Sequence, residues 1–435
     1  MNYRTGLVAA MLLLGLCSPV ALPAFAQFEP LGSKFACAEK DTYFQGSAVA
    51  ISADVGTVLI GAGSDIPGFD GGACVWALNG DSFAQQGKLL IGSGISKPND
   101  ILASIRDPFP TSRNQGGSVG LSADGNTAII GGMSGVAWVW TRSHGVWSQQ
   151  GPRLVGSGEI GIRYDNSSVA LSADGNTAVV GFAGDNDGRG AFWVWTRKGA
   201  AWTQQGTKHG GTEVGSNGQA CGSSVALSAD GNAALIGCSG DQDGIGAAAV
   251  WTRANGVWSQ PGRKLVGKGA VGKASQGSSV AISADGNTAI IGGSGDDDGL
   301  GAAWVWTRTN GVWSQQGSKL VGAGAAGKSL QGSSVALSAS GDIALVGGMN
   351  DRDGIGATWA WVRNSGQWTQ AGSKLVGLSR LDVGGRTYEG VGGKANQGKA
   401  VALSINGELA VIGGPKEDVP TGFHGAVWLF AIAEH

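Results

Sequence analysis

The chain has 435 residues and a formal net charge of −2, with 30 Lys and Arg against 32 Asp and Glu. That balance gives no electrostatic reason to expect nucleic acid or an anionic membrane surface as a partner. Glycine is abundant at 80 residues, but 42% of the chain is hydrophobic and 16 residues are Trp, which excludes a disordered tract. Many short strands joined by tight turns would use this glycine.

Residues 1–26 have the pattern of a signal peptide. Arg4 supplies the positive charge, Leu7–Leu16 the apolar run and Ala24–Ala26 the small-x-small cleavage pattern, so we expect the mature chain to begin at Gln27. The apolar run is shorter than the roughly 20 residues that span a bilayer. The sequence therefore predicts an exported protein (periplasmic, secreted or cell-surface associated) with no membrane span.

A motif of the type GSSVALS recurs seven times after this segment. Its central valines are Val49, Val119, Val169, Val225, Val280, Val335 and Val401. The spacing defines a unit of roughly 55 residues, with two longer intervals that mark insertions. In one copy, Ser278–Ser283 alternates small polar and apolar residues, and the Asp-Gly of Ala284–Asn287 is a hairpin signal. The segments TAIIGG, AAWVWTR and GVWSQQGSKLVG then predict three more strands, and no helical periodicity appears.

The chain ends predict how this array closes. The seventh unit stops one strand short at Gly425–His435, while Leu31–Cys37 matches the fourth-strand ending Gln316–Gly322. A propeller closes by completing its last blade with the start of the chain. Residues 27–435 are therefore predicted to form an all-β, seven-bladed β-propeller of four-stranded antiparallel blades, closed by the N-terminal strand.

The repeat also resembles a known family. The runs QGSSVAISADGNTAIIGG, GAAWVWTR and WSQQGSKLVG within Gln276–Gly322 are similar to the bacterial FG-GAP-type repeat, which is related to the N-terminal propeller of integrin α-chains. The resemblance covers about residues 28–433 and implies the propeller fold and an exported adhesion or ligand-recognition role. The chain departs from the integrin pattern at the first intra-blade turn, where ADGN replaces a calcium loop.

An acidic turn of the type GDxDG follows the second strand of four units. Its carboxylates are Asp185, Asp187, Asp241, Asp243, Asp296, Asp298, Asp351 and Asp353. Two acids two residues apart begin like a calcium loop, but a full site needs about 6–8 oxygens. Asp also favours turns through bonds to its own backbone. We expect a turn that presents charge, with weak calcium binding as the alternative and no cofactor required.

Four cysteines remain in the mature chain, an even number in an exported protein. We expect the disulfides Cys37–Cys74, which joins the closing strand to the first blade, and Cys221–Cys238. Counting from the hairpin turn, Cys238 opposes Ser223, which makes Cys221 its diagonal neighbour.

The unique residues accumulate in three non-repeated segments: Ser93–Asn114, Leu378–Asn396 and Lys416–His424. Strand direction puts all three on one face of the disc, where loops on a rigid scaffold usually carry recognition. The candidate ligand-binding residues are Arg106, Asp107, Phe109, Arg113, Arg380, Asp382, Arg386, Tyr388, Glu389 and His424.

These patterns predict a non-catalytic binding or adhesion module, a monomer, for a protein or carbohydrate ligand. All 16 Trp fall in third or fourth strands, which favours packing between blades over stacking on sugars. Two alternatives stay open: a carbohydrate-active hydrolase or lyase, and a lectin with a site in several blade gaps. An enzyme would carry a unique acid and base cluster, whereas a lectin would repeat its site.

Overall fold

The computed structural model describes residues 27–38 without 33, 43–63, 71–80, 82–93, 114–159, 165–210 and 218–432 without 384–385, 392, 420–421 and 424. The side chains of residues 378–391 and 418–423 are not described. The predicted signal peptide lies outside the described residues. Within the described part, no helix is long and apolar enough to cross a membrane.

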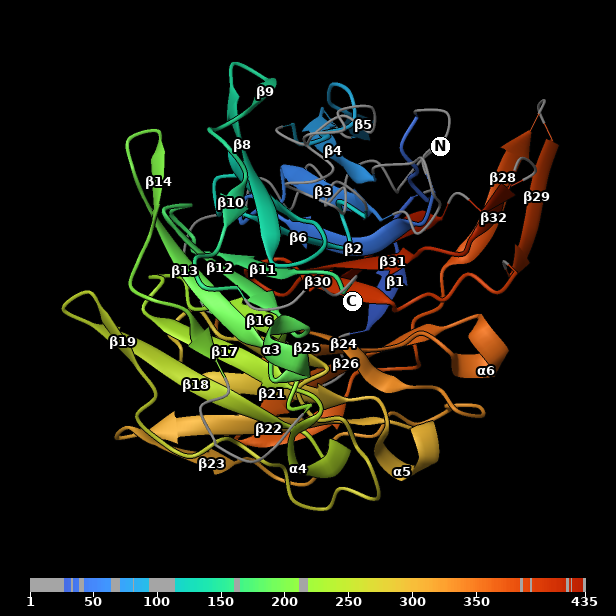
Figure 1. Cartoon of the computed structure of the whole chain (residues 1–435). Helices are drawn as coiled ribbons and strands as arrows, with labels where there is room; N and C mark the ends of the chain where they lie inside the picture. The colour runs from blue at the N-terminus through green and yellow to red at the C-terminus, as the bar shows by residue number, and fades with distance from the viewer. Residues whose placement is uncertain are drawn as a thin grey trace.

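Seven four-stranded antiparallel blades follow one another along the chain (Figure 1). Blades one to three comprise β2 (Gln45–Ile51), β3 (Thr57–Ala62), β4 (Gly72–Asn79) and β5 (Ser82–Gln85); β6 (Ser118–Leu121), β7 (Thr127–Gly131), β8 (Val136–Ser143), β9 (Val146–Gln149) and the short β10 (Leu154–Val155); and β11 (Ser168–Leu171), β12 (Thr177–Phe182), β13 (Ala191–Lys198), β14 (Ala201–Gln204) and the short β15 (His209–Gly210).

Blades four to seven repeat this order. They comprise β16 (Cys221–Leu227), β17 (Ala233–Cys238), β18 (Ala247–Ala254) and β19 (Val257–Ser259); β20 (Ser279–Ile282), β21 (Thr288–Gly293), β22 (Ala302–Thr309) and β23 (Val312–Gln315); β24 (Gln331–Leu337), β25 (Ile343–Gly348), β26 (Ala357–Asn364) and β27 (Gln367–Gln370); and β30 (Ala400–Leu403), β31 (Leu409–Gly414), β34 (Ala426–Ile432) and β1 (Phe28–Pro30).

The N-terminal strand completes blade seven, as the sequence predicts. Phe28 of β1 pairs with Ile432 of β34, and further on the N–H of Phe35 donates to the carbonyl of Val427 at 2.8 Å. The first strands of the blades pack side by side around the ring, and β2 of blade one contacts both β6 and β30. The ring is therefore closed, and the fold is an all-β seven-bladed propeller.

The core lies between the blades. The second strand of each blade is almost wholly buried, and the first tryptophan of the WxW pair is fully buried in four blades: Trp138, Trp193, Trp304 and Trp359. A glycine in the connecting chain packs directly on each of these indole rings, where no side chain would fit: a Cβ at Gly267 would lie 2.2 Å from Cδ1 of Trp304. The packing role predicted for these tryptophans is confirmed.

Both predicted disulfides are present, Cys37–Cys74 and Cys221–Cys238. The expected diagonal placement of the second is wrong. A β-bulge between Cys221 and Val225 shifts the register of β16 against β17, and this shift places Cys221 directly opposite Cys238.

Two features add to the predicted strands. Each acidic turn is a tight four-residue turn whose second and third residues have left-handed backbone angles: α3 (Asp185–Gly188), α4 (Asp241–Gly244), α5 (Asp296–Gly299) and α6 (Asp351–Gly354). The second insertion is a hairpin of β28 (Leu378–Val383) and β29 (Arg386–Val391), and blade seven carries a small hairpin of β32 (Asp418–Val419) and β33 (Gly422–Phe423).

Candidate functional site

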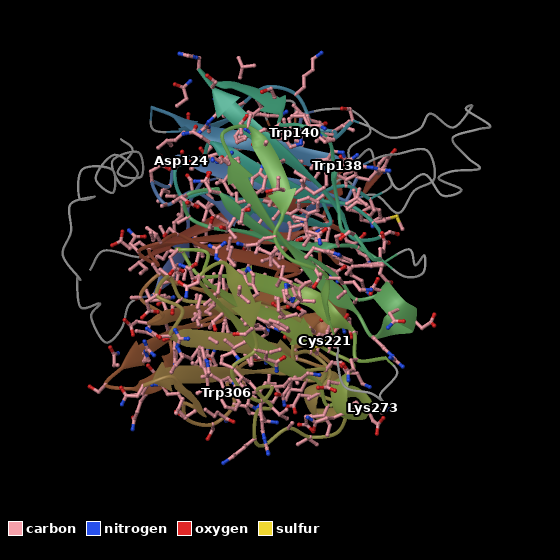
Figure 2. The ribbon with its side chains drawn as sticks, turned by 60° about the vertical axis from the view of Figure 1, so that its left-hand side comes forward. Asp124, Trp138, Trp140, Cys221, Lys273 and Trp306 are labelled. Atoms are coloured by element: carbon pink, nitrogen blue, oxygen red, sulfur yellow. A yellow bond between two sulfur atoms is a disulfide. The ribbon has the colours of Figure 1, made fainter. Side chains whose placement is uncertain are left out.

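The acidic turns and the segments that connect successive blades lie on the same face of the propeller, here called the connector face. The N–H of Val271, between blades four and five, donates to Asp296 Oδ1 at 2.7 Å, and Ala326 binds Asp351 in the same way. Asp124 belongs to a first-to-second-strand turn, and Figure 2 shows it on the other side of the molecule from the connector residue Lys273.

The first aspartate of each acidic turn is buried and forms an ion pair with the lysine that follows the fourth strand of its own blade. The pairs are Asp185–Lys208 at 2.7 Å, Asp241–Lys264 at 3.0 Å, Asp351–Lys374 at 2.5 Å and Asp296–Lys319. The aspartate is 23 residues before its lysine in every case. These carboxylates therefore tie the turn to the outer edge of the blade.

The second aspartate of the turn faces solvent. In α5, Asp297 and Asp298 both adopt left-handed backbone angles, with φ of 50° and 54°. The chain therefore changes direction after the buried Asp296, before it reaches Asp298. Asp298 is 90% exposed and lies 3.0 Å from the exposed Lys328. The two acids of one turn thus have separate cationic partners. Across the described residues there is no cluster of three or more His, Cys, Asp or Glu side chains that could hold a metal ion.

Blade seven makes the same ion pair from the two ends of the chain. Glu417 follows its second strand, and Lys34 follows the closing strand; their side chains are 2.7 Å apart and only 1% and 10% exposed. None of these five lysines is among the site residues predicted from the sequence. The constant spacing between aspartate and lysine was the signal that could have revealed four of them.

Five of the predicted ligand-binding residues lie on the hairpin β28–β29: Arg380, Asp382, Arg386, Tyr388 and Glu389. The backbone register sets Arg380 opposite Glu389 and Leu381 opposite Tyr388. The other five, Arg106, Asp107, Phe109, Arg113 and His424, lie outside the described residues.

The base of this hairpin joins two blades on the connector face. The N–H of Asn396 donates to the carbonyl of Gly354 in α6 at 2.8 Å, and the N–H of Lys416 in blade seven donates to Ala395 at 3.0 Å. In Figure 1 the hairpin stands away from the blades, above α6. The end of the second insertion therefore lies beside the start of the blade-seven segment. The first insertion ends at blade two, where Gln115 binds Gly72 of blade one.

The opposite face carries a second repeated polar set. In blade two, Asp124 accepts from the Ser122 hydroxyl and, at 3.0 Å, from the N–H of Asn126. Burial alone would raise the pKa of Asp124, but these hydrogen bonds and the charge of Arg142 hold it below its ordinary value. The same balance lowers the pKa of three further aspartates: Asp174, Asp230 and Asp285.

The propeller resembles solved structures. A crystal structure of RRP9 WD40 repeats superposes with a TM-score of 0.54 over 94% of this chain and 100% of that chain, at 12% sequence identity. The likeness shows the fold. At this identity, and with 1176 matching chains in all, it carries no statement about ligand or activity. No family model matches the sequence, and no curated protein matches it.

Proposed function

We propose that this propeller is an exported, non-catalytic binding module of the FG-GAP-like type, for a protein or glycan ligand. Its ligand contacts come from the non-repeated segments of the connector face, Ser93–Asn114, Leu378–Asn396 and Lys416–His424. The two disulfides support an oxidising, exported compartment.

The observation that carries this proposal is the contrast between the repeats and the hairpin β28–β29. On the connector face the buried acids of the repeats are already occupied by lysines of their own blades. The hairpin strands pair with each other, and within the described residues neither pairs with a blade. A rigid ring that supports a projecting segment of unique charged and aromatic residues is suited to recognition.

A loop exchange tests the proposal. Leu378–Asn396 is replaced by Ala323–Leu330, the short connection that the propeller itself uses between blades five and six. The mature parent and this chimera are applied to glycans and extracellular proteins printed on one array. We expect the chimera to lose binding and to keep the melting temperature of the parent, because only the projecting hairpin is removed.

Two further variants make the result decisive. The control is Val312→Thr, which changes a 69% exposed side chain at a hairpin tip on the opposite face and should leave binding intact. The combined substitution R106A, R113A, R386A and Y388A should abolish binding without any change in chain length. Binding that survives in both the chimera and the combined variant, but is lost in Asp296→Asn, would place the site in the repeats and refute the proposal.

A further inference from the structure

A repeated clamp joins most neighbouring blades on their outer edges. Gln86 of blade one accepts hydrogen bonds from Arg142 and Trp147 of blade two, both at 3.1 Å. Gln150 binds Arg197 and Trp202, Gln205 binds Arg253 and Trp258, and Gln316 binds Arg363 and Trp368. A threonine of the earlier blade is the second acceptor for the arginine: Thr57, Thr127, Thr177 and Thr288.

The clamp is absent at both junctions of blade seven, and there the glutamine, arginine, tryptophan and threonine are all replaced. Ala371 stands at the glutamine position of blade six, and it packs in one apolar cluster with Phe28 and Ile432. Leu31 and Phe83 both pack against one apolar cluster between blades seven and one. At both junctions the polar contacts of the clamp are therefore replaced by apolar packing from both blades.

The junction between blades four and five is the exception. Blade five keeps Arg308 and Trp313, which lie 5.6 Å apart in a cation–π contact. Blade four, however, has Pro261 in place of the glutamine and Ala233 in place of the threonine. Among the described residues, Arg308 therefore donates only to Asn287, and the indole N–H of Trp313 has no acceptor.

An open groove of about 850 Å³ lies against this unmatched edge of blade five. Trp306 and Trp313 form its apolar wall, and Trp306 is labelled in Figure 2. The rest of its lining is polar or small: Lys268, Gly269, Ser314, Gln315, Gly317, Ser318 and Lys319. Its volume and its mixture of aromatic rings with a few polar groups are those of a small-ligand site.

Lys268 is a cationic residue of the groove lining, and Arg308 lies next to the lining residue Trp313. The carbonyl of Lys268 accepts from the indole of Trp304 at 2.9 Å, which fixes this lysine over the start of β22. Arg308, four residues after Trp304 in β22, is outside the lining itself and stacks over Trp313, with 5.6 Å between its guanidinium carbon and the ring centroid. Lys319 is paired with Asp296, and Asp285 lies near Arg308. The exposed ammonium group of Lys268 has no acidic partner among the described side chains.

From this geometry we infer that the groove binds an acidic oligosaccharide whose sugars carry carboxylates. The C–H face of a pyranose ring packs on an indole ring, and the half-buried Trp313 offers one beside the buried Trp306. A guanidinium group with unused N–H donors favours a carboxylate, and a cationic rim disfavours a cationic ligand. The inference rests on the proposed binding function and adds a second site, outside the non-repeated segments.

The test uses oligogalacturonate, with a neutral cello-oligosaccharide of equal length as the reference, in calorimetric titrations of the mature protein. Pro261→Gln restores the clamp of the other blades, so the new side chain should occupy Arg308 and Trp313. We expect it to weaken oligogalacturonate binding at least tenfold without lowering the melting temperature. Trp313→Leu and Lys268→Ala should also weaken binding, whereas the matched change Trp368→Leu in the clamped blade six should not.

The outcomes separate this site from the proposed function. Equal affinity of the parent for the neutral and the acidic sugar, no binding of the acidic sugar, or unchanged binding in Pro261→Gln would each overturn the groove assignment. If array binding then still depends on the hairpin β28–β29, the proposed function stands without the groove. Acidic sugar binding that is lost in Pro261→Gln but kept in the hairpin chimera supports the groove independently.

Discussion

Lys34 and Glu417 are 383 residues apart in the sequence, yet their charged groups lie 2.7 Å from each other. Their contact repeats, across the two ends of the chain, the ion pair that Asp351 and Lys374 make within blade six. Beside it, β1 pairs with β34, and Cys37 is bonded to Cys74 of the first blade. Closure therefore depends on a strand, an ion pair and a disulfide that act within a few residues of one another.

Glu417→Gln should destabilise the propeller strongly. Removing one partner of a buried pair leaves the other charge uncompensated, which typically costs about 3–5 kcal/mol. Thermal and urea unfolding of the mature protein measure the loss. The control is Asp298→Asn, because Asp298 and Lys328 are both exposed and such pairs add little stability. If the two variants unfold alike, the closing pair has no special role.

Removal of Phe28–Cys37 should lower the melting temperature more than any single substitution at the closure. The truncation deletes β1, Lys34 and the Cys37–Cys74 disulfide together and exposes the edge of β34. The matched control is the double change Cys37→Ser with Cys74→Ser, which by loop entropy should cost about 4 kcal/mol at most. A truncated chain that melts like this control would show that the strand itself contributes nothing.

Much of this fold could be predicted from the sequence because the repeat supplies its own register. Seven copies located every blade, and the match of Leu31–Cys37 to a fourth strand identified the closing element. The bulge near Cys221 was not predictable, since counting from a hairpin turn assumes a regular ladder. The clamp was not predictable either, because it joins residues of different blades. Pro261 stands out only once the structure shows that Gln316, at the same position of blade five, accepts a hydrogen bond from Arg363 of the next blade.

Acid should destabilise the propeller by protonating the aspartates in the turns between the first and second strands of the blades. The pKa values of Asp124, Asp174, Asp230 and Asp285 are lowered in the fold, so their stabilisation is present above the unfolded value of about 3.9 and is lost as the pH falls through the lowered values. Replacing all four by Asn should lower stability at pH 7 and flatten its decline below pH 4. Melting temperatures from pH 7 to pH 2 decide this.

In blade six the same turn lacks the aspartate, so the interaction can be added there by substitution. Ser340 occupies the turn position that Asp124 holds in blade two, and it contacts the Ser338 hydroxyl at 3.2 Å. Asp342 stands where blade two has Asn126, and its carboxylate would repel a new aspartate at position 340. Ser340→Asp combined with Asp342→Asn should therefore raise the melting temperature at pH 7 and have no benefit at pH 2. An equal effect at both pH values would mean that the aspartates act through turn geometry and not through their charge.

His209 should make the protein less stable below neutral pH. It stacks on Phe192 at 5.1 Å, and burial lowers its pKa because the charged form is poorly solvated. The neutral form is thus favoured in the fold, so its contribution is present above the unfolded value of about 6.5 and is lost as the pH falls below it. Leu265 and Leu320 hold the same position in blades four and five. His209→Leu should remove the step in melting temperature between pH 7 and pH 5, while His144→Leu should leave it unchanged.

Calcium should change the stability of the propeller little. In each acidic turn the first carboxylate already binds a lysine ammonium group, as Asp351 binds Lys374, and the second faces solvent. Ligand binding raises stability by RT ln(1 + [L]/Kd), which is only about 0.4 kcal/mol when the calcium concentration equals Kd. We therefore expect melting temperatures in 5 mM calcium and in chelator to agree closely, and Lys374→Met to lower both equally. A large upward shift with calcium, abolished by Asp353→Asn, would instead show that the turns are calcium sites.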